Sequence, residues 1–345
     1  MSTMNTQPHP YRYRYTDLMG ESVGGEALAC SDEWFGDCAN LVKEAAPIFK
    51  EGYFVESGQW MDGWESRRSF GRAARANSAI DYDWCVLKLG IAGTLHGADI
   101  ETTHFRGNAP EYAALEGAWC PSGVTDATDW IELVPKCRVE AHAHNLFEVL
   151  DKRPCTHLRL KMFPDGGVAR LRAWGSPRIE RENFVEGELV DLASVLQGGR
   201  GVLCSDEFYS SPSNLLMPQP GTNMGDGWET RRRRDTGNDW CIIRLGMAGN
   251  IRKVVLDTAH FKGNYPDRFS LQATHTERGD LDAADIQWEL VIGETPLQAH
   301  QLHQFASEIL VTAGEVFTHV RLNIYPDGGV SRLRILGEPA WGESG

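Results

Sequence analysis

The sequence lacks any apolar run approaching the roughly 18 residues that a membrane-spanning helix needs. Its first 15 residues, MSTMNTQPHPYRYRY, contain no hydrophobic signal-peptide core. It also lacks an excess of positive charge, because 34 Lys and Arg stand against 48 Asp and Glu and give a formal net charge of −14. A general nucleic-acid-binding protein needs a basic surface, so this balance argues against nucleic acid and against an anionic membrane as partners.

Cysteine motifs of metal-binding and redox proteins are missing as well. None of the eight cysteines forms a CxxC pair, so neither a zinc ribbon nor a thioredoxin-like site is indicated. A chain of 345 residues can bury a core without disulfides. We therefore expect reduced, mostly buried cysteines and a cytoplasmic location. No GxSxG, Walker or HExxH motif is present either.

The strongest positive signal is an internal duplication, because five blocks of the first half recur in the same order in the second half. A period near 160 residues is too long for a solenoid unit and marks two copies of one whole domain. The pairs are CSDEWFGDCANL (30–41) with CSDEFYSSPSNL (204–215), DGWESRR (62–68) with DGWETRR (226–232), DWCVLKLGIAG (83–93) with DWCIIRLGMAG (239–249), THFRGNAP (103–110) with AHFKGNYP (259–266), and THLRLKMFPDGGVARLR (156–172) with THVRLNIYPDGGVSRLR (318–334).

The pattern inside each copy predicts an all-β fold. Val, Ile, Leu and aromatic residues alternate or run together in WCVLKLG, THLRLKMF and their partners, as is typical of strands. We interpret PDGG as the turn of a β-hairpin, because Pro and Asp open turns and Gly supplies positive φ. We expect two tandem jelly-roll β-sandwiches with little helix. The expected segments are a flexible tail (1–15), a first repeat (16–176), a charged linker (177–189), a second repeat (190–338) and a C-terminal tail (339–345).

The DGWESRR and DGWETRR strings are the most specific polar features. An acid at this position would carry a proton, and an arginine would bind a carboxylate or ureido oxygen through its planar fork. An ion-pair network around a buried Trp explains the same residues equally well, and the pattern alone leaves both interpretations open. The candidate acids are Asp62, Glu65, Asp226 and Glu229, and the candidate substrate-binding arginines are Arg67, Arg68, Arg231 and Arg232.

Two further shared blocks supply candidates. THFRGN and AHFKGN place a histidine where a strand enters a loop, and His104 and His260 are candidate acids or bases there, although a lone histidine is more often structural. The asparagines of the same blocks, and the arginines that follow PDGG, are candidates for substrate binding. These are Asn108, Asn264, Arg170 and Arg332.

The histidine spacings give weak support to a metal centre. Glu101 and His104 would point to opposite faces of a strand, whereas His142 and His144 would share one face of an extended segment. We therefore predict no metal ligands and no required cofactor. A divalent metal ion stays open as an alternative that the ligand spacing does not support.

Together the shared blocks resemble the allantoicase family over about residues 16–340, including the duplication itself. The resemblance implies two jelly-roll domains similar to galactose-binding folds. It also implies hydrolysis of allantoate to (S)-ureidoglycolate and urea in purine and allantoin degradation, and assembly into a homo-oligomer. It transfers no settled set of catalytic residues. The alternative interpretation is a tandem carbohydrate- or small-ligand-binding module, but the shared loops present acids, arginines, histidine and asparagine rather than aromatic platforms.

One difference between the copies favours the first as the catalytic one. Its segment between the DGW and DWC blocks is longer and adds Arg72 and Arg75 beside the acid–arginine string. Duplicated domains can diverge so that one keeps the site and the other supports it. A site between domains or subunits is equally compatible with the sequence.

The first prediction concerns assembly. Two sandwich units with shared apolar content offer self-complementary faces, so we expect the chain to self-associate. Light scattering at micromolar concentration should report a mass that is a multiple of 38.4 kDa. A monomer under these conditions would count against the expectation.

Overall fold

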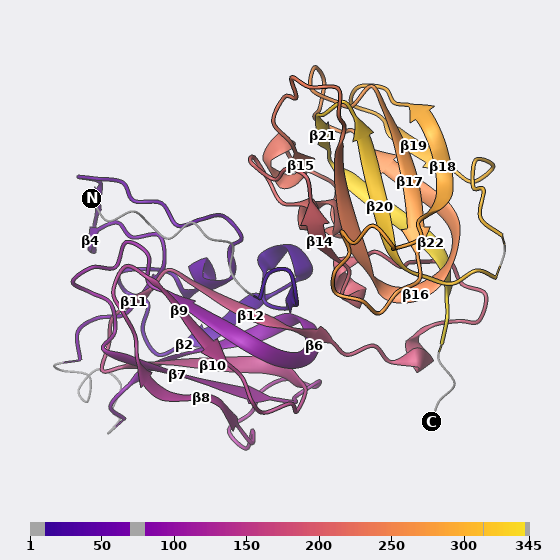
Figure 1. Cartoon of the computed structure of the whole chain (residues 1–345). Coiled ribbons are helices and arrows are strands. Elements are labelled where there is room, and N and C mark those ends of the chain that lie inside the picture. The colour runs from indigo at the N-terminus through magenta and orange to yellow at the C-terminus, as the bar shows by residue number, and fades with distance from the viewer. Residues whose placement is uncertain (1–10, 70–79, 313, 342–345) are drawn as a thin grey trace. The chain divides into compact units, whose positions relative to one another are not determined.

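The computed structural model describes residues 11–69, 80–312 and 314–341, which form two units of matching topology (Figure 1). The first unit comprises residues 15–178, and the second begins at Ile179. The described residues Tyr11–Arg14 group with the second unit. There, the Tyr13 hydroxyl donates a hydrogen bond to Glu207, and Arg12 pairs with the same carboxylate at 3.5 Å.

The regular elements among the described residues of the first unit are strands and short 3-10 turns. They are β1 (Thr16–Asp17), η1 (Glu21–Val23), β2 (Glu26–Cys30), η2 (Cys38–Val42), β3 (Phe54–Val55), β4 (Gly58–Gln59), β5 (Trp64–Glu65), β6 (Asp83–Glu101), β7 (Tyr112–Ala118), β8 (Ile131–Arg138), β9 (His144–Glu148), β10 (Cys155–Phe163), β11 (Gly167–Val168) and β12 (Arg170–Pro177).

The second unit repeats this order, except that it begins with η3 and has η6 in place of β3 and β4. Its elements are η3 (Arg181–Asn183), β13 (Val190–Asp191), η4 (Val195–Gln197), β14 (Arg200–Cys204), η5 (Pro212–Leu216), η6 (Met224–Asp226), β15 (Trp228–Glu229), β16 (Asp239–Asp257), β17 (Arg268–Thr274), β18 (Glu289–Pro296), β19 (Leu302–Phe305), β20 (Phe317–Tyr325), β21 (Gly329–Val330) and β22 (Arg332–Pro339).

One long strand in each unit joins the two layers of the sandwich. The first half of β6 pairs with β2 and β10, and its second half pairs with β9 and β12, all antiparallel. Strand β16 has the same four partners in the second unit, namely β14, β20, β19 and β22. The predicted jelly-roll β-sandwich is therefore the observed fold of both units.

The strand crosses between layers at a glycine of the repeated LG motif. A Cβ on Gly90 would lie 2.5 Å from the carbonyl oxygen of Val23, and one on Gly246 would lie 2.4 Å from that of Gln197. Real Cβ atoms do not approach so closely, so only glycine lets the neighbouring backbone pass here.

The prediction of a hairpin at PDGG is wrong. Strand β10 pairs with β6 and β7, whereas β12 pairs with β1 and β6, so the strands that flank the turn are not partners. The local pattern identified a turn correctly, but alternation cannot tell whether the next strand stays in the same layer. PDGG instead carries the chain from one layer to the other through the short strand β11.

Three shared motifs meet at one buried aromatic ring. Phe105 of the THFRGN block is fully buried and packs with Met61 and Ala169. A Cβ on Gly167 would lie 2.0 Å from the Phe105 ring, and one on Gly63 would lie 2.7 Å from it. Phe261 occupies the same place against Gly329, at 1.8 Å from the corresponding Cβ position. The glycines of DGW and PDGG therefore leave room for this ring.

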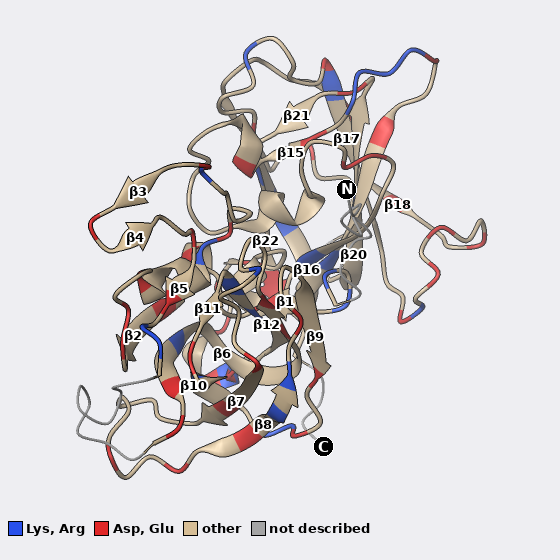
Figure 2. Cartoon of the chain, turned by 90° about the vertical axis from the view of Figure 1, so that its left-hand side faces the viewer, with Lys and Arg blue, Asp and Glu red and all other residues tan. Residues whose placement is uncertain are grey.

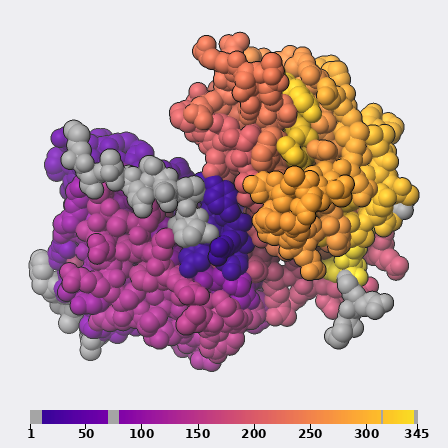
Figure 3. Space-filling view, viewed as in Figure 1, coloured from indigo at the N-terminus to yellow at the C-terminus, as the bar shows by residue number. Residues whose placement is uncertain are grey.

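The surface of the described residues carries both signs of charge. Basic and acidic segments are interspersed along strands and loops of both units (Figure 2). The space-filling view shows closely packed atoms within each unit (Figure 3). No helix among the described residues is long and apolar enough to cross a membrane.

The second prediction tests the ring-on-glycine contact. Gly167→Ala should push Phe105 and its loop outward, and should lower the free energy of unfolding by about 1–3 kcal/mol as overpacking does. Urea unfolding followed by Trp fluorescence measures the change. Gly107→Ala is the matched control, because a Cβ there meets nothing within 4 Å. Equal stability of the two variants would contradict the packing argument.

Candidate functional site

The ring-on-glycine contact brings an acid and an amide together at the surface of each unit. Glu65 on β5 pairs with Gly167 on β11, and the amide of Gly167 donates to the carbonyl of Asn108 at 2.7 Å. The Asn108 side chain in turn donates to Glu65 Oε1 at 2.9 Å. The second unit repeats the pair, with Asn264 donating to Glu229 Oε1 at 2.5 Å. These four candidates are therefore paired as acid and amide.

Glu65 is the more deeply placed of the two acids. Its exposed fraction is 9%, and burial raises the pKa of its carboxyl group. The hydrogen bond from Asn108 and the positive charge of Arg68 lower the pKa and offset only part of this effect. A carboxyl group with a raised pKa holds its proton at higher pH, which suits a proton donor.

An arginine and an aspartate complete the cluster. In the first unit Arg68 pairs with Asp165 of PDGG at 3.1 Å and reaches the carbonyl of Gly107 at 3.4 Å. Nearly half of the Arg68 side chain stays exposed, so part of its fork faces solvent. Asp165 is buried and also accepts the backbone amide of Ser69.

In the second unit the equivalent residues line a common cavity. Glu229, Arg232, Asn264 and Asp327 line a cavity of about 570 Å³. Arg232 is exposed, whereas Asp327 accepts the backbone amide of Arg233 at 2.8 Å. A positively charged fork, a carboxyl group and an amide thus face one space large enough for a small anion.

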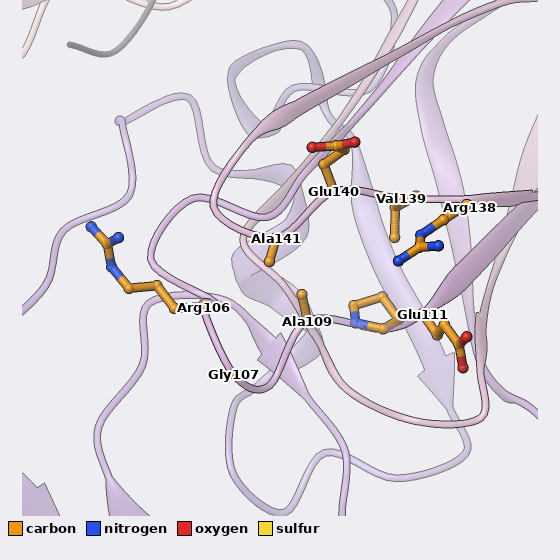
Figure 4. Close-up of a pocket in the computed structure, with 9 residues that line it drawn as sticks. Arg106, Gly107, Ala109, Glu111, Arg138, Val139, Glu140 and Ala141 are labelled. Carbon is orange, nitrogen blue, oxygen red and sulfur yellow. The ribbon is translucent and has the colours of Figure 1, made fainter. Parts of the chain in front are cut away.

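The first unit also has a cavity of ≈ 540 Å³, beside the loop that follows His104. Figure 4 shows Arg106 extending away from the other labelled side chains of this cavity. Its lining includes Arg138, Glu140 and Glu111 but none of the candidate residues. We therefore take the Glu65 cluster, and not this cavity, as the first unit's candidate site. The predicted Arg72 and Arg75 of the longer segment lie outside the described residues.

Asp62 and Arg170 form a buried ion pair rather than a free acid and a free arginine. Arg170 has no exposed surface, and its Nη2 donates to Asp62 Oδ2 at 2.8 Å. Other Arg170 donors bind the carbonyls of Ala45, Asp62 and Ala169. Burial alone would raise the pKa of Asp62, but hydrogen bonds from Arg170 and from the Ile48 amide outweigh it and lower the pKa. This geometry positions the loop before β5.

The second unit arranges the same two residue types differently. Arg332 donates to the backbone carbonyl of Asp226 at 2.6 Å and to that of Gln219 at 2.7 Å. The Asp226 carboxylate accepts hydrogen bonds from Thr222 and from the Asn223 amide. Asp226 therefore caps a short turn, and Arg332 is largely buried against backbone carbonyls.

The first arginine of each string is held by the SDE block. Arg67 Nε donates to Asp32 Oδ2 at 2.7 Å, and Arg231 Nε donates to Asp206 Oδ2 at 2.8 Å. Each guanidinium also lies over an aromatic ring, with Arg67 5.2 Å from the Trp34 centroid. Each of these two guanidinium groups is thus held by an aspartate and an aromatic ring of its own unit.

The candidate histidines adopt an uncommon backbone conformation. His104 and His260 both have φ of 71°, and their partners His142 and His300 have φ of 54° and 50°. In both units the backbone amide of the first histidine donates to Nδ1 of the second, at 2.9 and 2.8 Å. Non-glycine residues with positive φ cost free energy and gather at functional sites. The repeated conformation supports a functional role for this pair of loops.

The ring of His104 is oriented by a backbone carbonyl. Its Nε2 lies 3.1 Å from the carbonyl oxygen of Pro47, and His260 Nε2 lies 2.8 Å from that of Gly221. A carbonyl only accepts, so Nε2 carries the proton and Nδ1 of the neutral ring holds the free lone pair. The ring is therefore set up to accept a proton at Nδ1.

His144, whose spacing from His142 the sequence offered as weak support for a metal centre, binds a protein group, and so does His303 of the second unit. His144 contacts Asp99 at 2.7 Å, and His303 accepts the backbone amide of Gln298 at 2.9 Å. Within the described ranges, one group of His, Cys, Asp or Glu has three ligand atoms in mutual reach, and it consists of Cys30, Glu33 and Cys38. This group lies apart from the predicted site residues.

Two pairs of aspartates organise the site, and neither pair was among the residues predicted from the sequence. Asp32 and Asp206 hold the first arginines, and Asp165 and Asp327 hold the loop after the second arginines. All four stand in shared blocks, SDE and PDGG. Because these aspartates recur in both halves, the sequence could have indicated that they belong to the site. We interpreted PDGG as a turn alone.

Comparisons with known proteins match the chain along nearly its whole length. The family model described as the allantoicase repeat matches residues 16–178 and 190–340. A probable allantoicase of Pseudomonas aeruginosa is 43% identical over 340 residues, which cover 97% of this chain and 99% of the relative. A probable allantoicase 1 of Burkholderia mallei is 44% identical over 94% of each chain. The crystal structure of allantoicase from Saccharomyces cerevisiae superposes with a TM-score of 0.78 at 32% identity, covering 94% of this chain and 93% of that one.

The third prediction tests the buried ion pair. Arg170→Ala should lower the free energy of unfolding near neutral pH by about 3–5 kcal/mol, because it removes the buried cationic partner of the Asp62 carboxylate and leaves the Ile48 amide and the more distant Lys43. The paired Asp62 has a lowered pKa, so its stabilisation is present at neutral pH and is lost as the pH falls through that pKa. Without Arg170, burial raises the pKa and protonation relieves the charge.

The difference between wild type and variant should therefore shrink as the pH falls below about 4. Urea unfolding at several pH values measures it. Arg153→Ala is the matched control, because Arg153 pairs with Asp151 at the surface and its loss should change little. A neutral-pH effect no larger than that of the control would refute the assignment.

Proposed function

The chain belongs to the allantoicase family, and we infer that it hydrolyses allantoate to (S)-ureidoglycolate and urea. The reaction is a step of allantoin and purine degradation, and the enzyme is a hydrolase of carbon–nitrogen bonds in linear amidines. One observation gives the strongest support for where this reaction takes place. Both units hold a glutamate bound to an asparagine, next to an exposed arginine and at the same three loops.

The chemistry of allantoate fits this set of side chains. The substrate carries one carboxylate and two ureido groups on a single tetrahedral carbon. A carboxylate is well bound by an arginine fork, which Arg68 or Arg232 offers. Ureido groups need both donors and acceptors, which asparagine and aspartate provide. We assign substrate binding to Arg68, Asn108 and Asp165, with Arg232, Asn264 and Asp327 in the second unit.

The reaction breaks a carbon–nitrogen bond at that tetrahedral carbon, so no acyl carbonyl is attacked. The nitrogen of the remaining ureido group donates its lone pair and expels the other group, leaving an iminium-like carbon. The departing nitrogen takes up a proton and leaves as urea. Water then adds to the carbon and loses a proton, which gives ureidoglycolate. The chain must therefore supply one proton donor and one proton acceptor.

Glu65 is our proposed donor, because burial raises the pKa of its carboxyl group and Asn108 fixes its orientation. His104 is our proposed acceptor, because the Pro47 carbonyl holds the proton on Nε2 and leaves Nδ1 free to take one from water. Asp62 is a poor donor, because its ion pair with Arg170 lowers its pKa. Glu229 and His260 are the counterparts in the second unit.

The first unit is our proposed principal site. Its glutamate is buried, whereas Glu229 is only half-buried. We also propose that the enzyme acts in the cytoplasm as a homo-oligomer. The family supports self-association, and the eight cysteines, all of which are free thiols, support a reducing compartment.

The fourth prediction tests both the reaction and its residues. Wild-type protein should release urea from allantoate, and Glu65→Gln or His104→Asn should cut kcat by at least ~100-fold with the fold intact. Glu229→Gln and His260→Asn are the matched variants and should cost less. As a proton donor, Glu65 must be protonated, so wild-type kcat should fall as the pH rises through its raised pKa, and Glu65→Gln should lose this limb.

The outcomes separate the two parts of the proposal. Absence of urea release by the wild-type protein would refute the activity. Normal turnover in all four variants would refute the residue assignment but leave the activity in place. Larger losses from the Glu229 and His260 variants would move the principal site to the second unit. Circular dichroism of each variant verifies that the fold is retained.

A further inference from the structure

Three thiols and one carboxylate converge in the first unit at the base of the loop that joins β2 to η2. Ligand atoms of Cys30, Glu33 and Cys38 all lie within 4.8 Å of one another. The Cys38 thiol is also within hydrogen-bonding contact of both Cys30 and Cys85. Cys85 is the direct partner of Cys30 in the ladder between β2 and β6. Three potential ligands therefore meet at one point, and the Cys85 thiol lies next to one of them, Cys38, as a fourth.

Backbone geometry holds these groups in place. Cys30 ends strand β2, Cys38 begins η2, and Cys85 lies in the central strand β6. The Glu33 carboxylate accepts the backbone amide of Cys38 at 3.1 Å, which draws the carboxylate to the thiols. Cys30 and Cys85 are therefore fixed by the ladder between β2 and β6. Glu33 and Cys38 are fixed by the short loop that follows β2.

The cluster has a closed base and an open side. Cys85 is fully buried and Cys38 is 8% exposed, whereas Cys30 is partly exposed and Glu33 lies at the surface. A cation can thus enter from solvent on the carboxylate side and meet the thiols behind it.

We propose that Cys30, Glu33, Cys38 and Cys85 bind one zinc ion in a tetrahedral site. Zinc prefers four such ligands, with sulfur at about 2.3 Å, which places tetrahedral sulfurs about 3.8 Å apart. The ligand atoms of Cys30, Glu33 and Cys38 already lie within 4.8 Å of one another, so a small contraction brings them to the spacing of a zinc site. Zinc binds thiolates, so each thiol releases a proton when the ion enters. The inference is independent of the proposed function.

The second unit provides an internal control. Its equivalents of Cys30, Glu33 and Cys85 are Cys204, Glu207 and Cys241, but Pro212 stands where the first unit has Cys38. The Glu207 carboxylate is occupied by the Tyr13 hydroxyl and Arg12. The second unit therefore lacks both the central thiol and the available carboxylate.

The zinc ion would fix the loop that supports the candidate site. Residues 31–37 lie between the ligands Cys30 and Cys38, and Asp32 in this loop holds Arg67. The amides of Phe35 and Gly36 donate to the Glu65 carbonyl at 3.2 Å, and the Glu65 amide donates to the Gly36 carbonyl at 3.0 Å. We assign the ion a structural role, because it ties both ends of this loop without contacting the Glu65 carboxylate.

The fifth prediction is stoichiometric zinc binding by the full, reduced chain. After removal of metals with a chelator, titration with Zn²⁺ in competition with a colorimetric chelator should give one ion per chain. Co²⁺ in place of Zn²⁺ should give the intense thiolate-to-cobalt absorbance of a cysteine site. Cys38→Ser should weaken Zn²⁺ binding on the order of 100-fold or more, because it removes the thiolate common to all contacts.

Cys204→Ser is the matched control and should bind Zn²⁺ like the wild type. Alkylation mapped by mass spectrometry on the wild-type chain gives a second measurement that needs no variant. Zinc should slow modification of Cys30 and Cys38 and leave Cys204 unchanged. Failure of the wild-type chain to bind zinc, equal binding by Cys38→Ser, or a disulfide between Cys30 and Cys38 in place of a metal site would each overturn the proposal.

Discussion

The packing of one phenylalanine ring against two glycines is the constraint on which the candidate site depends. Phe105 leaves no room for a Cβ at Gly63 or Gly167, and Phe261 repeats the arrangement against Gly329. Because the three motif loops share this contact, none of them can shift without the others. The loops in turn set the distance between the Glu65 carboxyl group and the Asn108 amide. The contact between the phenylalanine ring and the glycines thus fixes the positions of the polar side chains at the surface.

The charged residues of the shared blocks divide into two roles. Arg170 and Arg67 are bound by Asp62 and Asp32, and these pairs hold loops in place. The second arginine of each string has an exposed side chain and stands beside the glutamate. The sequence left two interpretations of DGWESRR and DGWETRR open, an ion-pair network and a set of ligand-binding groups. The structure places residues of both kinds in each string. Adjacent residues take different roles because they point to different sides of the loop.

Duplication makes the two units informative about each other. The glutamate–asparagine pair and the left-handed histidines recur in both, so they belong to the ancestral domain. The cysteine cluster and the Asp62–Arg170 side-chain pair occur in the first unit only, since Pro212 and a turn cap replace them in the second. Features common to both units are candidates for binding and chemistry, whereas features of one unit show how the copies have specialised.

The duplication, the all-β class, the jelly-roll fold and the family could be predicted from the sequence, because each rests on patterns that are local or that recur along the chain. The blocks that supply the polar groups could be predicted in the same way. The role of PDGG as a link between two layers could not, since alternation along a strand does not identify its partners. The same holds for the difference between Arg170, which has no exposed surface, and Arg68, whose side chain is about half exposed. Burial and pairing depend on residues more than 100 positions apart, as for Asp62 and Arg170, and no local pattern carries that information.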